Sequence, residues 1–470
     1  MDLRGKIVLV LGIGETGLSM ARWLGRCGAT VRAADTRLDP PRLAEFKQSL
    51  PDARMYEGGF NAEAFSGIDL IGISPGVPLA EPLVRQAVAN GVPVVGDMEL
   101  FALALRTVQP EDAARPAIIG ITGSNGKTTV TAMVGAMTRK AGWDVEVAGN
   151  IGPAVLDAWM RRQDAGRFPR AWVLEISSFQ LETTQSLSLD AATVLNVTED
   201  HLDRYAGMED YAAAKARIFR WSGPVGKGGG VQVLNRDDPL VRSMGLIGRE
   251  QVTFGCGVPA RGEEYGLLSE EDDIWLMQGK NRLIRASDLV VTGLHNAANA
   301  LAALALCRAL GLPLEPLLEA LREFKGLPHR MEKVAAVGGV TFYDDSKGTN
   351  VGATVAALNG LSRTAVLIAG GDGKGQDFSP LAEPVAKHAR AVVLIGRDAK
   401  NVAAALEPSG VPLHFASSME EAVQQGFMLS EQGDAVLLSP ACASLDMFRN
   451  YVHRSEVFVA AVRALPQGTR

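Results

Sequence analysis

The stretch "IIGITGSNGKTTVTAM" places a glycine-rich turn between an apolar run and a helix-like segment, and it contains Gly126-Lys127-Thr128. Backbone N–H groups of such a turn, together with the N-terminus of the helix that follows, attract phosphate oxygens. A lysine here lies along the β- and γ-phosphates of a nucleotide, and the next hydroxyl can bind Mg²⁺. The general pattern has a glycine five residues before Gly126, where this chain has Ile121. We therefore predict a nucleoside triphosphate site with an irregular loop.

Acidic and imidazole side chains follow two further apolar runs. Glu175 ends the run in "AWVLEIS", and an unpaired acid at the end of a buried strand is costly, so a metal ion is a natural partner. A capping or turn role is the alternative. The segment "LNVTEDHLDRY" gathers Asp200, His201 and Asp203, and such a histidine serves as a metal ligand, a general base or a neighbour of a helix cap. Lys215, in "YAAAKARIF", resembles an ordinary exposed helical lysine.

A second glycine pattern lies near the N-terminal end. Gly12, Gly14 and Gly17 have the spacing G-x-G-x-x-G after an apolar run, and Asp35 follows near the end of the next run. Taken alone, this pattern indicates an NAD-dependent dehydrogenase. The same glycine geometry serves any diphosphate at a helix N-terminus. Two phosphate loops predict two phosphorylated ligands, one of them a triphosphate.

Three polar clusters follow apolar runs in the last third of the chain, in "FYDDSKGTN", "GGDGKGQDF" and "SPACASLDMFRNY". Each could be a polar loop or a helix cap. If the runs are parallel strands, the clusters meet at one edge of a sheet, where doubly wound folds bind ligands. The candidate side chains in them are those of Asp345, Lys347, Thr349, Lys374, Ser444 and Tyr451.

The elements that position these residues are short Val/Ile/Leu runs alternating with helical stretches, which indicates β-α-β units and parallel sheets. A chain of 470 residues is longer than a single hydrophobic core usually supports, so more than one domain is expected. We predict an α/β protein of three domains: a Rossmann-like substrate domain at 1–96, a P-loop-type ATPase domain at 97–326, and a Rossmann-like domain at 327–470. The polar segment Leu105–Ala117 is predicted to be a connection.

Composition narrows the class of protein. The net charge of −6 argues against nucleic acid as the main partner. Four cysteines lie far apart without a C-x-x-C pair, which indicates reduced thiols and no zinc site. The apolar start "KIVLVLGIG" is short, runs into glycines and lacks a cleavage pattern, and no apolar run is long enough to span a bilayer. We expect a cytoplasmic protein.

In this order, the stretches resemble the Mur ligases, the family that builds the peptide of the bacterial cell wall. The resemblance runs from "GIGETG" through "DTR", "SPG", "GNIG", "EISSFQLE", "DHLDRY", "AAKARI", "GLHNAANALAA" and "LPHRME" to "SPACASLDMF". The stretch "TGSNGKTT" resembles that family's own phosphate loop. The "NPR" motif of members that add a diaminopimelate is missing. The resemblance implies an ADP-forming ligase that joins D-glutamate to UDP-N-acetylmuramoyl-L-alanine through an acyl phosphate, in peptidoglycan precursor synthesis.

The resemblance also implies residue roles. Catalytic roles go to Lys127, Glu175, His201 and Lys215. ATP would contact Gly123, Asn125, Gly126, Lys127, Thr128, Thr129, Asn296, Arg330 and Asp345. The UDP-linked substrate would contact Thr16, Thr36, Arg37, Ser74, Asn150 and His201, so that Asp35 need not bind a ribose. D-glutamate would contact Lys347, Thr349, Lys374, Ser444 and Tyr451. Mg²⁺ would be held by Thr128, Glu175, His201 and Lys215, the last as an N-carbamate.

Three other functions compete with this one. A ligase of the folylpolyglutamate synthase type is disfavoured by "ETG" and "DTR" in the N-terminal region, and a dehydrogenase is disfavoured by "TGSNGKTT". A non-catalytic nucleotide-binding scaffold is disfavoured by the presence of Lys127, Glu175 and His201. We expect a monomer that acts on small molecules and binds no nucleic acid.

Overall fold

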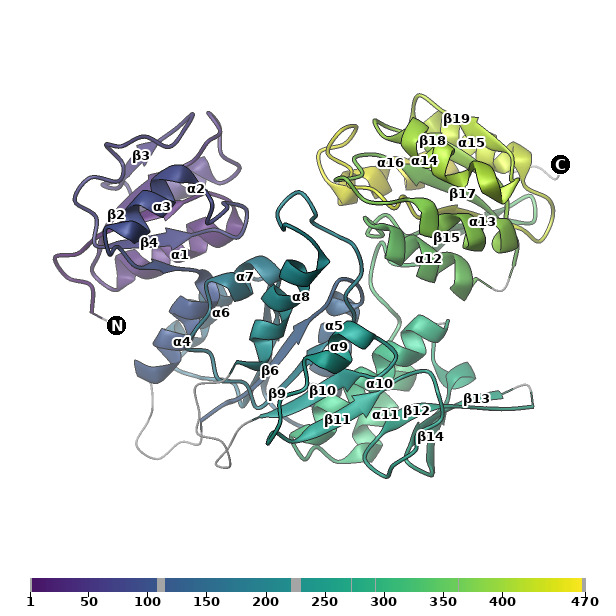
Figure 1. The fold of residues 1–470 in the computed structure, drawn as a ribbon, viewed down its shortest axis with the longest axis horizontal. Helices are drawn as coiled ribbons and strands as arrows, with labels where there is room; N and C mark the ends of the chain where they lie inside the picture. Colours follow the sequence, from purple (N-terminus) through teal and green to yellow (C-terminus); the bar gives the residue numbers. More distant parts are fainter. Residues whose placement is uncertain are drawn as a thin grey trace.

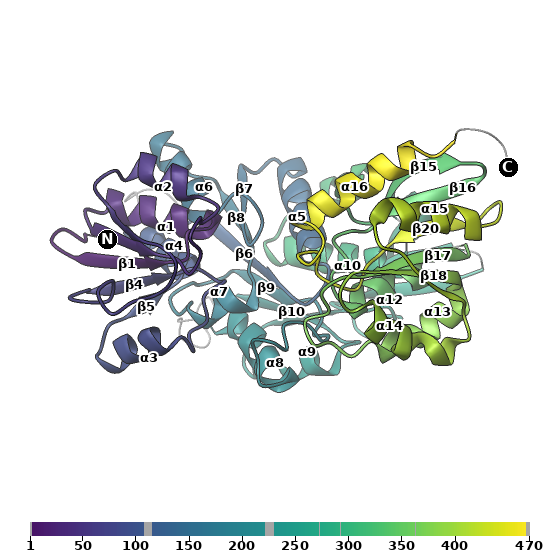
Figure 2. The same cartoon turned by 90° about the horizontal axis from the view of Figure 1, so that it is seen from above.

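The computed structural model describes residues 2–107, 115–220, 230–271, 273–291, 293–361 and 363–466. Three separate β-sheets, each covered by helices, follow one another along the chain (Figure 1). Seen from above, the middle unit lies between the N-terminal and C-terminal units (Figure 2). The prediction of three α/β domains is thereby confirmed. Residues 108–114 of the predicted connection lie outside the described residues.

The N-terminal sheet has five parallel strands in the order β3-β2-β1-β4-β5. Its central strand, "IVLVL", is buried because β-branched and leucine side chains pack on both faces. The elements are β1 (Ile7–Leu11), α1 (Glu15–Arg26), β2 (Thr30–Ala34), α2 (Leu43–Ser49), β3 (Arg54–Tyr56), β4 (Leu70–Ile73), α3 (Pro82–Ala89) and β5 (Val94–Val95).

The middle sheet has nine strands in the order β14-β13-β12-β11-β10-β9-β6-β8-β7, parallel from β7 to β12 and antiparallel beyond. Its elements are α4 (Asp97–Thr107), β6 (Ala117–Thr122), α5 (Lys127–Lys140), β7 (Val145–Gly149), α6 (Val155–Asp164), β8 (Ala171–Glu175), α7 (Ser178–Glu182), β9 (Ala191–Val194), α8 (Met208–Ala216), β10 (Val231–Asn235), α9 (Pro239–Ser243), β11 (Gln251–Phe254), β12 (Tyr265–Glu270), β13 (Asp273–Gln278), β14 (Asn281–Arg285), α10 (Leu294–Ala309) and α11 (Leu314–Glu323).

The C-terminal sheet has six strands in the order β15-β16-β20-β17-β18-β19, of which only β15 is antiparallel to its neighbour. Its elements are β15 (Glu332–Val337), β16 (Val340–Asp344), α12 (Val351–Gly360), β17 (Ala365–Gly370), α13 (Ala382–His388), β18 (Ala389–Ile395), α14 (Ala399–Leu406), β19 (Leu413–Phe415), α15 (Met419–Leu429), β20 (Ala435–Leu438) and α16 (Tyr451–Arg463). Within the described parts of the chain, no helix has both the length and the apolar character needed to cross a membrane.

Helix α4 joins the first unit to the second and begins with a buried acid. Asp97 Oδ2 accepts a hydrogen bond from Gln180 Nε2 at 2.9 Å, while its Oδ1 has no partner among the described residues. Burial raises the pKa of Asp97 to about 6. Its carboxylate form is therefore destabilising at neutral pH.

This acid makes stability depend on pH. Between about pH 4 and pH 6 the folded chain keeps a proton that the unfolded chain releases, so the free energy of unfolding falls as pH rises through this window, by at most about 3 kcal/mol. We expect Asp97→Asn to raise the thermal unfolding midpoint at pH 8 and to raise it by much less at pH 4.5. Equal shifts at both pH values, measured by circular dichroism, would contradict the assignment.

Candidate functional site

The phosphate loop connects β6 to α5 and has its glycines where the backbone requires them. Gly126 precedes α5 with φ = +83°, and a Cβ there would lie 2.6 Å from Asn299 Oδ1 of α10. Lys127, the first residue of α5, donates from Nζ to the carbonyls of Gly123 at 2.7 Å and Ser124 at 2.9 Å. Burial lowers the pKa of Lys127. The loop thus presents a helix N-terminus and one partly buried amine at the same point.

The loop that follows β9 holds the phosphate loop in place. Asn196 Oδ1 accepts from the backbone N–H of Asn125 at 2.8 Å, and Asn196 Nδ2 donates to the Asn125 carbonyl at 3.1 Å. Ser124 Oγ donates to the Thr198 carbonyl at 2.9 Å. These bonds rigidify the anion-binding turn because its backbone groups are tied to a second strand end.

A buried carboxylate lies beside this loop. Glu175, at the end of β8, is 1% exposed, and its Oε1 accepts from Asn150 Nδ2 at 2.8 Å. Its Oε2 is buried and has no partner among the described residues. The Thr128 hydroxyl, which accepts from an Arg330 guanidinium N–H at 2.7 Å, supplies a second oxygen. A carboxylate and a hydroxyl are oxygen ligands of the kind that Mg²⁺ prefers, so these residues fit that ion.

His201 lies in a strained turn next to an acid. Its backbone has φ = +56°, a region that non-glycine residues seldom adopt. Nε2 lies 3.6 Å from Asp200 Oδ2, but burial lowers the pKa of His201 to about 4, so the ring is neutral near pH 7 and the contact is not an ion pair. A neutral imidazole can accept a proton or bind a cation.

Lys215 is not the exposed lysine that its neighbours in sequence suggest. It is 1% exposed, donates from Nζ to the Gly123 carbonyl at 3.0 Å, and lies 4.3 Å from the centroid of the Tyr211 ring. Burial, helped by the charge of Lys127, lowers the pKa of Lys215 well below its ordinary value. The exposed-helix interpretation is therefore wrong, and the amine is close to the phosphate loop.

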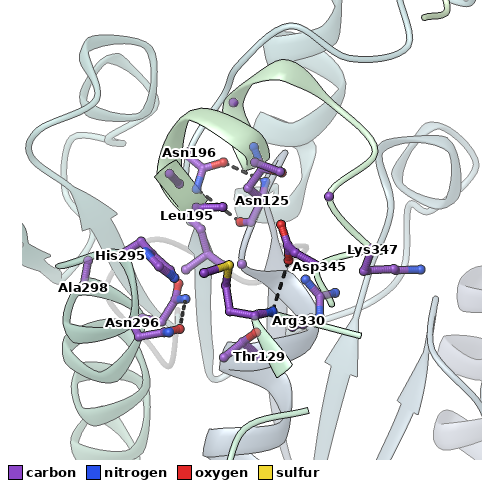
Figure 3. A pocket seen from close by; sticks show the side chains of 18 of the residues that line it. Asn125, Thr129, Leu195, Asn196, His295, Asn296, Ala298, Arg330, Asp345 and Lys347 are labelled. Carbon is purple, nitrogen blue, oxygen red and sulfur yellow. Dashed lines mark hydrogen bonds between the residues drawn. The ribbon is translucent and has the colours of Figure 1, made fainter. Parts of the chain in front are cut away.

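A cavity of about 310 Å³ opens between the middle and C-terminal domains (Figure 3). Six of the residues predicted to contact ATP line it: Asn125, Gly126, Thr129, Asn296, Arg330 and Asp345. Asp345 Oδ2 accepts from Ser439 Oγ at 2.7 Å, and burial raises the pKa of Asp345 to about 7. Lys347, predicted to contact D-glutamate, also lines this cavity. Figure 3 shows Arg330 and Asp345 near Asn125 and Thr129, whereas the Lys347 side chain extends away from them.

A second cavity, of about 410 Å³, lies on the N-terminal domain and is lined by Thr16, Thr36, Arg37, Ser74 and Asn150 among others. Its glycine turn is sterically required, because a Cβ on Gly17 would lie 1.8 Å from the Gly12 carbonyl oxygen. His201, predicted with this set, is not among its lining residues.

Asp35, the acid of the dinucleotide-like pattern, is engaged within the protein. Arg37 donates to it from Nε at 2.8 Å and from a terminal nitrogen at 2.7 Å, and the backbone N–H of Ile13 donates at 2.7 Å. A ribose would have to compete with these bonds for the carboxylate.

Of the residues predicted to contact D-glutamate, four lie on loops that follow β16, β17 and β20, namely Lys347, Thr349, Lys374 and Ser444, and Tyr451 begins α16. Lys347 Nζ lies 3.7 Å from the centroid of the Tyr451 ring, and burial lowers the pKa of Lys347 to about 8. Ser444 is buried and Thr349 is half-buried. Lys374, with φ = +52°, forms an ion pair from Nζ to Asp200 Oδ1 at 2.6 Å.

Side chains from the middle and C-terminal domains meet in contacts that no sequence pattern indicated. Asn350 Nδ2 donates to Asn125 Oδ1 at 3.0 Å and to Asp200 Oδ2 at 3.3 Å, beside the pair between Lys374 and Asp200. Tyr211, which covers Lys215, also carried no signal in an alanine-rich helix. Asp200 could be suspected only from its place directly before His201.

A further group, His329, Glu332 and Asp344, converges near the start of β15. Its members are already paired, since His329 Nδ1 lies 2.9 Å from Asp344 Oδ2 and 2.7 Å from Ser455 Oγ, and Glu332 accepts from the His329 backbone. These bonds attach His329, which lies between the middle and C-terminal domains, to β15, β16 and α16.

Family models match three consecutive parts of the chain. Residues 6–96 match the Mur ligase MurD-like N-terminal domain, residues 121–307 the Mur ligase middle domain, and residues 329–442 the Mur ligase glutamate ligase domain. Together these segments cover all three sheets except the first residues of β6.

The chain is also similar to two curated proteins named UDP-N-acetylmuramoylalanine--D-glutamate ligase. The one from Nitrosospira multiformis is 67% identical over 99% of this chain and 97% of its own length. The one from Nitrosomonas europaea is 61% identical over 99% of this chain and 98% of its own length. Two solved structures share the fold. UDP-N-acetylmuramate-alanine ligase MurC from Thermotoga maritima aligns with a TM-score of 0.60 at 22% identity, over 98% of this chain and 99% of the other. MurF from Acinetobacter baumannii aligns with a TM-score of 0.63 at 17% identity, over 98% of this chain and 91% of the other.

Proposed function

This chain belongs to the Mur ligase family, and from that premise we propose that it is the ATP-dependent ligase that joins D-glutamate to UDP-N-acetylmuramoyl-L-alanine, forming ADP and phosphate in peptidoglycan synthesis. One observation carries the proposal: Asn125 and Gly126 of the phosphate loop line a cavity whose other wall includes Arg330 and Asp345 of the next domain. Lys127 follows directly after Gly126 and bonds to the carbonyls of the same loop. An ATP held there is within reach of groups from two domains.

In the first step, an oxygen of the alanyl carboxylate attacks the γ-phosphorus of ATP, the bond from that phosphorus to the β,γ-bridging oxygen breaks, and an acyl phosphate and ADP are formed. Lys127 and Arg330 supply positive charge to the transferring phosphoryl group. Asn150 lines the cavity proposed for the UDP-linked substrate and also donates to Glu175, so it joins that cavity to the carboxylate proposed to hold Mg²⁺. Neutral His201 is proposed to contact the alanyl end.

In the second step, the amine of D-glutamate attacks the acyl carbon, and the tetrahedral intermediate collapses to the amide, releasing phosphate and a proton. We assign the acidic amino acid to Lys347, Thr349, Lys374, Ser444 and Tyr451. Two lysines match a ligand with two carboxylates. Lys374 would exchange its partner Asp200 for a substrate carboxylate, which keeps its charge paired before and after binding.

Mg²⁺ would be held by Thr128 and Glu175, joined by His201 and Lys215, and when bound it would neutralise charge on the phosphates. The depressed pKa of Lys215 supports its modification, because only the neutral amine adds CO₂, losing a proton to give an anionic carbamate. Its place beside the Gly123 carbonyl brings that anion to the phosphate loop.

The uridine diphosphate part is assigned to the N-terminal cavity, with Thr16, Thr36, Arg37 and Ser74 as contacts. The engagement of Asp35 by Arg37 supports this assignment over an NAD site. We also propose that the chain works as a cytoplasmic monomer.

The test is phosphate release from ATP with UDP-N-acetylmuramoyl-L-alanine and, in turn, D-glutamate, L-glutamate, L-lysine and diaminopimelate. We expect release with D-glutamate alone. Release with another amino acid would retain the ligase and refute the specificity, whereas no release with any of them would favour a nucleotide-binding scaffold.

A further inference from the structure

Arg204 bridges the middle and N-terminal domains beside the site. Its guanidinium donates to the Gly76 carbonyl at 3.2 Å, with the Pro75 carbonyl 3.5 Å away, and both residues line the N-terminal cavity. The same guanidinium carbon lies 4.4 Å from the centroid of the Phe179 ring. One side chain therefore contacts the wall of one domain's cavity and an aromatic ring of the next domain.

On the middle domain, the ring of Phe179 contacts both Arg204 and His201. Phe179 meets the His201 ring edge-on at 4.8 Å between centroids and stacks on Tyr205 at 5.9 Å. The backbone N–H of Arg204 donates to the His201 carbonyl at 2.9 Å, closing the turn that holds His201 at positive φ. A displacement of Arg204 would therefore displace His201.

The N-terminal end of the bridge is fixed without Arg204. Ser74 donates from its backbone to Leu11 at 3.0 Å and from Oγ to the Gly12 carbonyl at 2.7 Å, and Val77 donates to the Ser74 carbonyl at 3.0 Å. These bonds all lie within one domain. The cavity wall therefore keeps its position without Arg204. What the contact of Arg204 with Gly76 can fix is the position of the His201 turn relative to that wall.

We infer that Arg204 is a positioning residue, which sets His201 against the N-terminal cavity for a ligand that spans both. The inference rests on the proposed function, because the spanning ligand is a UDP-sugar with an alanyl carboxylate at its far end. A second bridge between the same domains, from Arg26 of α1 to Asp164 of α6 at 2.5 Å, supplies a matched comparison away from both cavities.

The experiment measures the affinity of UDP-N-acetylmuramoyl-L-alanine and of UDP by calorimetry, for the wild type and for Arg204→Ala, Arg204→Lys and Arg26→Ala. We expect Arg204→Ala to weaken the spanning ligand about tenfold and UDP by less than about twofold. Arg204→Lys can still donate to Gly76 but lacks the planar group over Phe179, so an intermediate loss is expected. Arg26→Ala should match the wild type.

Unchanged affinity of Arg204→Ala for the spanning ligand would overturn the inference. Equal losses for UDP and the spanning ligand would also overturn it, since they would indicate damage to the N-terminal cavity alone. A similar loss in Arg26→Ala would overturn it as well, since the effect would then belong to any contact between these domains and not to Arg204 beside His201. If Arg204→Ala fails to fold, the same two affinities are measured for Arg204→Lys, and a loss for the spanning ligand without an equal loss for UDP supports the inference. Failure of the wild type to bind the spanning ligand would refute the proposed function instead.

Discussion

Lys127→Ala is expected to reduce turnover by roughly a hundredfold or more, with a smaller change in the affinity for ATP. Lys127 is the partly buried amine at the N-terminus of α5, and its charge is most useful when negative charge moves between the phosphates and the leaving ADP. Because burial already disfavours its charged form, removal of the side chain should not lower the thermal unfolding midpoint. Steady-state phosphate release and circular dichroism measure the two quantities.

The matched control is Lys140→Ala at the other end of the same helix. Lys140 is exposed and paired with Glu323 at 2.8 Å, so its loss should leave turnover within about twofold. Near-normal turnover in Lys127→Ala would remove this lysine from the mechanism. A fall of turnover together with the unfolding midpoint would assign it to stability.

Glu175→Gln is expected to reduce turnover by roughly a hundredfold and to raise the Mg²⁺ concentration needed for half-maximal activity. The amide oxygen can still accept from Asn150, so the local fold is kept. What disappears is the negative charge at the buried oxygen that has no partner among the described residues. A magnesium titration of phosphate release separates a metal effect from a loss of folded protein.

Glu99→Gln supplies the comparison for a buried glutamate outside the site. Its Oε2 accepts from the backbone N–H groups of Gln185 and Ser186, both at 2.7 Å. It should leave the magnesium requirement unchanged. If Glu175→Gln shows the wild-type magnesium requirement at reduced turnover, Glu175 does not hold the metal ion.

The sequence predicted those parts of the molecule that are encoded locally. The glycine turn before Lys127 follows the end of a strand, and Glu175 is the last residue of β8. Glycines or a carboxylate at such a position are typical of phosphate or metal binding, so the residue type alone indicates the site. The alternation of apolar runs and helices predicted three largely parallel sheets for the same reason: buried strands and covering helices leave different periodicities. The antiparallel strands β13, β14 and β15 were not part of that prediction.

What could not be predicted depends on contacts between distant segments. Lys215 lies in an alanine-rich helix with little amphipathic pattern, so nothing nearby indicates that Tyr211 and the Gly123 carbonyl enclose it. The pair between Lys374 and Asp200 joins two domains, and its existence follows from how they are arranged. Asp35 matched a dinucleotide pattern, yet a neighbour two residues away, Arg37, engages it.

The cavity shared by the middle and C-terminal domains limits how such enzymes can diversify. Under the proposed assignments, residues of the third domain serve two tasks, because Arg330 and Asp345 line the cavity proposed for ATP while Lys374 and Ser444 are proposed to contact the amino acid. A domain exchange between relatives would therefore alter the amino acid added only if the incoming domain also carried an arginine and an aspartate at matching places. Recombination at this boundary is constrained by the nucleotide, and new amino acid preferences should arise more readily by substitutions within the third domain.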